Sequence, residues 1–138
     1  MDSRDSKSAS VTIRCKGAEA VRRLADATQA FVAEHALPAG DAARLSIIVE
    51  ELACNLSDHG EIGADGFVEL VLVHEPGAIA IMLSDSGVAF DLRSAESGEA
   101  IPERGGGAGI ALVRAWAEIV DYASEPGRNR LRLRMPLS

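Results

Sequence analysis

Apolar residues recur along the chain at spacings that change between two and three or four, and these spacings predict its secondary structure. Val11–Cys15 alternates apolar and polar side chains, which is typical of a strand. Ala18–Leu37 carries apolar side chains three and four residues apart, which predicts an amphipathic helix. Pro38-Ala-Gly40 ends that helix, and Asp41 can cap a second helix that runs to about Asp58.

The second half of the chain predicts two hairpins with a loop and a third helix between them. The predicted strands are Phe67–His74, Ala78–Ser84, Tyr122–Ser124 and Leu131–Met135, and the predicted helix is Ile110–Val120. Glu75-Pro-Gly77 is a hairpin turn signal between the first two of these strands. Leu92–Arg104 shows almost no periodicity, so we expect a mobile loop there.

The order of these elements predicts the fold class. Hairpins form antiparallel pairs, and the helices need a common sheet face to cover. We therefore expect a two-layer α/β sandwich in which three helices cover one face of a mixed, largely antiparallel sheet. At 138 residues the chain is long enough for one domain with a substantial core. We expect the polar residues 1–10 to be a disordered tail and residues 11–138 to form that domain.

Composition and charge narrow the classes of function. Hydrophobic residues make up 47% of the chain and charged residues 25%, as in ordinary soluble globular proteins. The net charge of -7 argues against direct nucleic-acid binding, and no apolar run approaches the roughly 20 residues that span a bilayer. Cys15 and Cys54 show no C-x-x-C spacing, so we expect two buried free thiols in a reducing cytoplasm.

Four arginines near the C-terminus are a local exception to the acidic balance. They are Arg128, Arg130, Arg132 and Arg134. Their period of two places them on one face of a strand. They could form a basic strip, but a solvated outer sheet face is the simpler interpretation and the one we favour.

The second predicted helix carries a polar strip beside its apolar one. At about 100 degrees per residue, the strip contains Arg44, Glu51, Asn55 and Asp58. The carboxamide of Asn55 offers Mg²⁺ a hard oxygen ligand without adding charge beside a phosphate chain. Glu51, one turn earlier, could accept a proton from an attacking hydroxyl group. A merely solvated helix face is the alternative.

A single carboxylate, Asp85, follows the apolar run Ile81-Met-Leu83 at the end of a predicted strand. A buried carboxylate there can accept a hydrogen bond from the exocyclic amine of adenine. Gly87 would let the backbone approach the ring closely. Asp-Ser-Gly is also a common turn tripeptide, so a plain turn is the alternative.

A glycine cluster, Gly105-Gly-Gly-Ala-Gly109, opens onto the third predicted helix. Free N–H groups and the helix dipole at such a helix start bind phosphate. The cluster lacks the Gly-Lys-Ser/Thr of a P-loop and the preceding strand of a dinucleotide fingerprint, and a flexible hinge is the alternative. In this order the three stretches offer a metal ligand, a base reader and a phosphate cradle, which indicates a purine-nucleotide site.

The same three stretches resemble the Bergerat-fold (GHKL) ATPase domain shared by gyrase, Hsp90, histidine kinases and MutL. Glu-x-x-x-Asn-x-x-x-His-Gly begins at Glu51, Asp-x-Gly-x-x-Phe-Asp begins at Asp85, and Gly-Gly-x-x-Gly-Ile-x-Leu-Val-Arg begins at Gly105. Within this family the chain looks most like the small bacterial anti-sigma-factor serine/threonine kinases. The resemblance covers Val11–Leu137.

The resemblance implies roles for individual residues. It implies that Glu51 is the catalytic base, that Asn55 is the Mg²⁺ ligand in the nucleotide site, and that Asp85 contacts adenine together with Gly87. The phosphate-contacting positions that it implies are Gly105, Gly107 and Gly109, with Arg104 near the γ-phosphate. The chain departs from the family pattern at Ser57, Asp58 and Glu118.

The resemblance also implies a function. It implies a cytoplasmic protein serine/threonine kinase that uses ATP and Mg²⁺, phosphorylates a STAS-type antagonist and sequesters a sigma factor, with a homodimer as one compatible form. A non-catalytic nucleotide-sensing interaction module of the same fold is the alternative. An unrelated α/β domain with coincidental motifs is a third. A histidine kinase fits less well, because we find no dimerisation helix and no separate phospho-acceptor domain in this chain.

Overall fold

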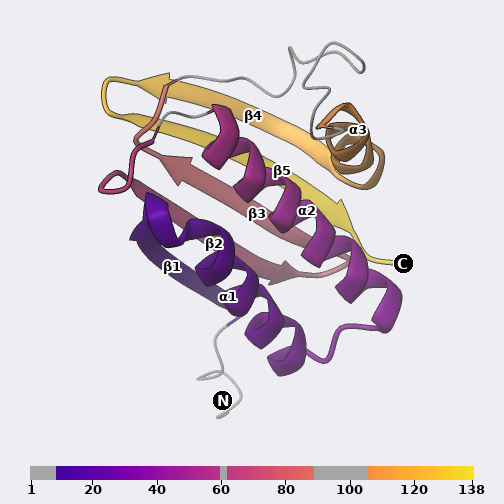
Figure 1. Ribbon diagram of the computed structural model, residues 1–138. Helices are drawn as coiled ribbons and strands as arrows, with labels where there is room; N and C mark the ends of the chain where they lie inside the picture. Colours follow the sequence, from indigo (N-terminus) through magenta and orange to yellow (C-terminus); the bar gives the residue numbers. More distant parts are fainter. Residues whose placement is uncertain (1–8, 60–61, 89–105) are drawn as a thin grey trace.

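The computed structural model of the protein describes residues 9–59, 62–88 and 106–138 (Figure 1). Its elements, in chain order, are β1 (Ser10–Lys16), a 3-10 turn (Gly17–Glu19), α1 (Ala20–Glu34), α2 (Ala39–His59), β2 (Phe67–Glu75), β3 (Ala78–Asp85), α3 (Gly106–Trp116), β4 (Glu118–Glu125) and β5 (Arg128–Pro136). The predicted loop Leu92–Arg104 lies outside the described residues, as does most of the predicted tail.

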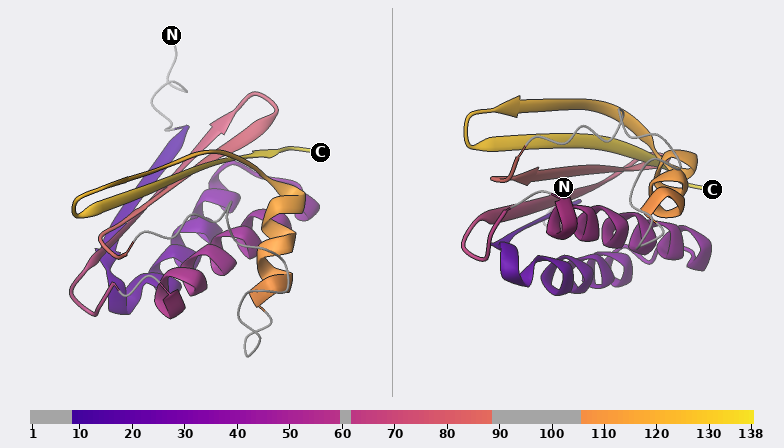
Figure 2. Two further views of the ribbon diagram at one scale, coloured as in Figure 1. Left: turned by 90° about the horizontal axis from the view of Figure 1, so that it is seen from above. Right: turned by 45° about the horizontal axis from the view of Figure 1, so that its top comes forward.

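Five strands form one open sheet in the order β1-β2-β3-β5-β4, and every neighbouring pair is antiparallel. The helices lie on one side of this sheet, so the described part of the molecule has two layers (Figure 2). The predicted α/β sandwich with a largely antiparallel sheet is confirmed, and no parallel pair occurs among the described strands. One reason is the connection after β1: α1 leads away and α2 returns, so β2 enters the sheet in the opposite direction (Figure 1).

The core lies between the sheet and the helices. Every second residue of a strand points into it, and these residues are mostly apolar. In β5, exposed and buried residues alternate from Arg128 to Pro136. Fully buried side chains include Val68, Leu70 and Leu72 of β2, Ile79 and Ile81 of β3, Leu133 and Met135 of β5, and Leu45, Ile48 and Val49 of α2. Full burial of such a side chain contributes about 1.5–3 kcal/mol. This packing holds α2 against β3, the two elements that carry the predicted site.

Helix α1 ends earlier than its apolar spacing predicts, at Glu34 instead of Leu37. Ala36 adopts a left-handed backbone conformation with φ of 50°, which a helix cannot continue through. The N–H of Leu37 then donates to the carbonyl of Val32 (3.2 Å), and Leu37 packs against the core from outside the helix. Leu37 would face the core whether or not the helix continued to it, so its apolar side chain does not indicate where α1 ends.

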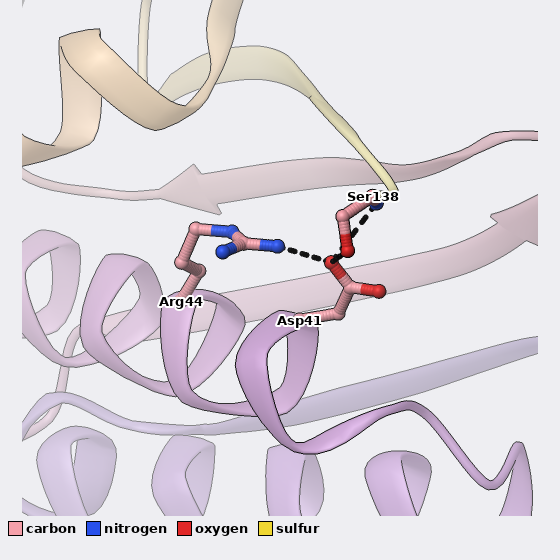
Figure 3. Close-up of polar contacts among 3 residues, drawn as sticks. All are labelled: Asp41, Arg44 and Ser138. Atoms are coloured by element: carbon pink, nitrogen blue, oxygen red, sulfur yellow. Dashed lines mark hydrogen bonds and ion pairs between the residues drawn. The ribbon is translucent and has the colours of Figure 1, made fainter.

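Asp41 does not cap α2 as predicted, because the helix already begins at Ala39 and Asp41 lies inside its first turn. Its carboxylate is buried (1% exposed), and Oδ1 accepts hydrogen bonds from the N–H of Ser138 (3.1 Å), the Ser138 hydroxyl (3.0 Å) and the Arg44 guanidinium (Figure 3). Burial alone would raise the pKa of this carboxyl, but the hydrogen bonds from Ser138 and Arg44 outweigh burial and lower it. Asp41 therefore ties the start of α2 to the residues after β5.

Helix α3 begins and ends four residues before the predicted Ile110–Val120. The residues assigned to the end of that helix belong to β4, which is longer than the predicted Tyr122–Ser124. A β-branched residue such as Ile119 favours a strand, and it pairs with Leu133 of β5. Only Ala117 separates the helix from the strand, so no turn signal marks the boundary.

Three expectations from the sequence concern the arginines of the last strand, the two thiols and membrane-spanning segments. The four arginines of β5 all lie on its exposed side, so the outer sheet face predicted for them is confirmed. Both cysteines are free, but only Cys15 is fully buried, and Cys54 is partly exposed. In the described residues, no helix is long and apolar enough to cross a membrane.

Candidate functional site

The polar strip of α2 brings Glu51 and Asn55 to one side of the helix, as the sequence predicts. Both residues are half-buried, whereas Asp58 at the end of the strip is exposed. Arg44, at the start of the strip, is paired with Asp41. The strip therefore supplies one carboxylate and one carboxamide, one helical turn apart, at the edge of the interior.

Glu51 lies directly against the first turn of α3. Gly109 of this helix is buried, and a Cβ atom at its position would overlap the Glu51 side chain, at 2.6 Å from Cδ and 3.3 Å from Cγ. Only a residue without a Cβ lets the helix backbone come so close to the carboxylate. Gly109 thus has a role in addition to the predicted phosphate contact: it makes room for Glu51.

Asp85 ends β3 with its carboxylate almost fully buried (6% exposed). Its Oδ1 accepts hydrogen bonds from the N–H of Gly87 (2.7 Å) and from the side-chain amide of Asn129 (3.1 Å). The hydrogen bond from Gly87 to Asp85 is typical of a local turn. The turn predicted as an alternative is therefore present, and it is compatible with a binding role for Asp85. The hydrogen bonds to this side chain from the described residues all end on Oδ1, so Oδ2 has no hydrogen-bond donor among them.

Asn129 is a site residue that the sequence motifs missed. It is buried (3% exposed) near the start of β5, opposite Asp85 in the register of the sheet. Its Nδ2 also donates to the carbonyls of Gly87 (2.8 Å) and Val88 (3.3 Å), and its Oδ1 accepts from the Ser124 hydroxyl (2.7 Å). One side chain therefore holds both Asp85 and the backbone that follows it.

Asn55 and Asp85 share the wall of a small hollow between α2 and the sheet. Its described lining consists of Leu52, Asn55, Leu56, Leu83, Asp85, Tyr122 and Leu131, and its volume is about 30 Å³. Apolar walls with one buried acceptor suit a flat ring that carries an amine. The hollow is smaller than a purine, and we interpret it as the inner end of the site. No motif had pointed to Tyr122 of β4.

The glycine cluster forms the first turn of α3 and does not precede the helix as predicted. Gly107 and Gly109 lie in this turn, where backbone N–H groups have no intrahelical acceptor. Together with the helix dipole, these N–H groups suit an anion. Gly105, Arg104 and Phe90, the phenylalanine of the motif that begins at Asp85, lie outside the described residues.

The donor set fits Mg²⁺ that is bound together with phosphates. Among the described residues, no three His, Cys, Asp or Glu side chains gather in a way that could hold a metal ion. Mg²⁺ commonly takes one or two protein oxygens and completes its coordination with phosphate oxygens and water. Asn55 lines the hollow, one turn from Glu51, and its side-chain oxygen is of the kind that would hold the ion.

The chain matches one protein family over most of its length. A family model described as a histidine kinase-like ATPase domain covers residues 16–135. Among solved structures, a blue-light activated histidine kinase of Erythrobacter litoralis superposes with a TM-score of 0.58 and 19% identity, over 89% of this chain and 42% of that one. The histidine kinase domain of the same protein gives 0.56 and 19%, over 88% and 61%. This chain thus spans less than two thirds of either. No curated protein sequence matches it significantly.

Proposed function

The chain belongs to the family of histidine kinase-like ATPase domains, and we propose that it is an ATP-binding protein serine/threonine kinase of the anti-sigma-factor type. In this role it uses ATP with Mg²⁺, phosphorylates a STAS-type antagonist and sequesters a sigma factor in the cytoplasm. One observation carries the nucleotide part of the proposal. A buried carboxylate, Asp85, has one oxygen already hydrogen-bonded and stands at the inner end of an apolar hollow.

This arrangement selects adenine over guanine. The exocyclic amine of adenine can donate to Oδ2 of Asp85, while Asn129 and Gly87 keep Oδ1 occupied. Guanine presents an oxygen at the equivalent ring position, which would leave the carboxylate without a donor in a buried place. A site built around a hydrogen bond rejects the analogue that lacks it, because the buried polar group is left unpaired.

Glu51 supports the catalytic part of the proposal. Its carboxylate lies beside the first turn of α3, where N–H groups and the helix dipole favour a phosphate chain. In the transfer, the hydroxyl oxygen of a substrate serine or threonine forms a bond to the γ-phosphorus while ADP leaves, and Glu51 takes the hydroxyl proton. Asn55 would hold Mg²⁺, which would neutralise charge on the phosphates.

A second candidate is a nucleotide-sensing interaction module of the same fold that transfers no phosphate. The contact between Glu51 and Gly109 favours it in one respect. A carboxylate that packs against a helix backbone can have a purely structural role, which needs no phosphate transfer. The two candidates share the base site, so a binding assay alone does not separate them.

Phosphate transfer and the stability of its product separate the candidates. Purified protein is incubated with Mg²⁺, γ-labelled ATP and a STAS-domain protein as the candidate substrate, and Glu51→Ala serves as the control. We expect label on the STAS protein that survives acid, as esters of serine and threonine do and phosphohistidine does not. Glu51→Ala should keep ADP affinity and lose roughly 10²–10⁴-fold in transfer rate.

Three results would contradict parts of this proposal. Tight ADP binding without label on the STAS protein would support the sensing module. Acid-labile label would indicate transfer to histidine, the activity named for the similar solved structures. A Glu51→Ala variant that transfers phosphate at the wild-type rate would remove Glu51 as the base.

A further inference from the structure

The face of the sheet opposite the helices is open in the described part of the chain (Figure 2). The strand register arranges this face in rows. One row contains Thr12, Val71, Met82, Arg132 and Asp121, and the next contains Ser10, Val73, Ala80, Arg134 and Glu118. These two rows pass from polar β1 through apolar β2 and β3 to the arginines of β5 and the acids of β4, whereas the row of Arg130 contains Arg14, Glu69, Ser84 and Ala123. The centre of the face is apolar and one side of it is basic.

A hollow of about 290 Å³ lies in this apolar centre. Its lining comes from β2, β3, β4 and β5: the apolar side chains include Val71, Val73, Met82 and Val120, Arg132 and Arg134 border it on β5, and one carboxylate, that of Glu75, borders it at the end of β2. Val120 is 48% exposed, more than any other large hydrophobic side chain among the described residues. It lies at the bulge of β4, between Ile119 and Asp121. A concave apolar patch with a polar rim is typical of a surface that binds a partner.

Two of the four arginines on this face already have acidic partners. Arg132 donates to Asp121 through Nε (3.1 Å) and Nη2 (2.5 Å). Arg128 lies 3.6 Å from Glu69 of β2. These ion pairs neutralise the charge of Arg132, which borders the hollow, and of Arg128, the first residue of β5.

The other two arginines, Arg130 and Arg134, have no hydrogen bond or ion pair within the described residues. Arg134 has Glu118 as its register neighbour on β4, but no ion pair joins the two. Arg130 lies between Ser84 and Ala123 in the register, so its neighbours on the two adjacent strands are uncharged. Both guanidinium groups are therefore available to carboxylates of another molecule, on a chain whose net charge is -7.

We propose that this face binds an acidic, extended polypeptide segment in which an apolar residue stands between two carboxylates. Arg130 and Arg134 are four residues apart on one strand, which corresponds to about 13 Å. In an extended segment, alternate residues share a face, so acidic residues at i and i+4 with an apolar residue at i+2 match Arg130, the hollow and Arg134. This surface is separate from the nucleotide site, which lies on the helix side of the sheet.

Charge decides between this occupant and two others. A second copy stacked face to face would present the same four arginines together with acids, so it complements Arg130 and Arg134 less well than an acidic segment does. A nucleic acid would offer phosphates to the arginines but no side chain for the apolar hollow. An acidic segment with a leucine-sized side chain satisfies both parts of the surface.

Fluorescence anisotropy with short labelled peptides tests the proposal. The probe carries glutamate, serine, leucine, serine and glutamate in that order. One control peptide has serine in place of leucine, and the other has lysine in place of both glutamates. We expect the probe to bind the wild-type protein, and the double variant Arg130→Gln/Arg134→Gln to weaken it about tenfold. The matched variant Arg22→Gln/Arg23→Gln removes the same charge from α1 and should leave the affinity unchanged.

A second variant addresses the hollow separately from the charge of β5. Val71→Gln places an uncharged polar side chain in the hollow and should also weaken the probe, and thermal melting of each variant checks that it is folded. The proposal is overturned if the probe does not bind, or if it binds the Arg130→Gln/Arg134→Gln variant as tightly as wild type. It is equally overturned if either control peptide binds as well as the probe. A protein dimer that Val120→Glu dissociates would assign the face to a second copy instead.

Discussion

Replacing Asn129 by alanine should both destabilise the fold and weaken nucleotide binding, because this side chain holds the proposed base reader. Its Nδ2 donates to Oδ1 of Asp85 (3.1 Å) and to the carbonyls of Gly87 (2.8 Å) and Val88 (3.3 Å). Its Oδ1 accepts a hydrogen bond from the Ser124 hydroxyl (2.7 Å). The variant Asn129→Ala removes all of these contacts at once.

The contacts do not contribute equally to stability. Ser124 is exposed and Gly87 is half-exposed, so water can replace the lost partner at both places. Asp85 is 6% exposed, so water does not fully replace its lost donor. A hydrogen bond to a charged group contributes about 1.5–3 kcal/mol, and we expect Asn129→Ala to lower the free energy of unfolding by about 2–3 kcal/mol. Ser124→Ala should cost only about 0.5–1.5 kcal/mol.

Nucleotide affinity should follow the orientation of Asp85. Without Asn129, the carboxylate can rotate and form its bond to adenine only part of the time, and we expect the affinity for ADP to fall about tenfold, or about 1.4 kcal/mol. Urea unfolding measures the stability, and calorimetric titration with ADP and Mg²⁺ measures the affinity under conditions where each variant is folded. Ser124→Ala, which leaves the Asp85 contact intact, should bind ADP like wild type.

The two readouts refute different steps of this reasoning. Unchanged stability of Asn129→Ala would show that the buried hydrogen bonds contribute nothing measurable. Reduced stability with wild-type ADP affinity would make Asn129 a purely structural residue that does not position Asp85 for a ligand.

The remaining predictions concern three other positions. ADP with Mg²⁺ should raise the melting temperature of the wild-type protein, GTP should not, and Asp85→Asn should abolish the ADP effect; equal shifts in both proteins would take Asp85 out of the site. Gly109→Ala places a methyl group against the Glu51 carboxylate, so it should lower the transfer rate far more than the ADP affinity, and a wild-type rate would show that this contact is irrelevant to transfer. The folded pKa of Asp41 is lowered, so its contribution to stability is complete above the unfolded pKa of about 4 and is lost as pH falls through the folded value. Asp41→Asn should therefore be less stable than wild type at pH 7 and should flatten the acid loss of stability seen in urea unfolding, and an unchanged acid slope would exclude Asp41 as its source.

Local spacing in the sequence was sufficient to predict part of the site. Glu51 and Asn55 are one helical turn apart, so their common orientation follows from helix geometry alone. Asp85 comes at the end of an apolar run, and the end of β3 is where the structure places it. The alternation of arginines with apolar residues in β5 likewise predicted which side of the strand is exposed.

Local spacing could not predict contacts between segments that are far apart in the sequence. Asn129 meets Asp85 only because β3 and β5 pair in one particular register, which the local pattern does not specify. One signal was present: Asn129 occupies an inward position of a strand whose other inward residues are apolar. A polar residue at such a position needs a buried partner. The contact of Gly109 with Glu51 depends on how α3 packs on α2, and no spacing in either helix indicates it.

Strand β5 connects the two surfaces that the proposals concern. Asn129 points inward to the base reader, and the next residue, Arg130, points outward to the open face. A shift of this strand on binding an acidic segment would therefore act on the side chain that orients Asp85. Linkage requires that any effect of the segment on nucleotide affinity equals the effect of the nucleotide on segment affinity. Measuring both affinities, each with and without the other ligand, thus distinguishes a coupled strand from two sites that are merely adjacent in sequence.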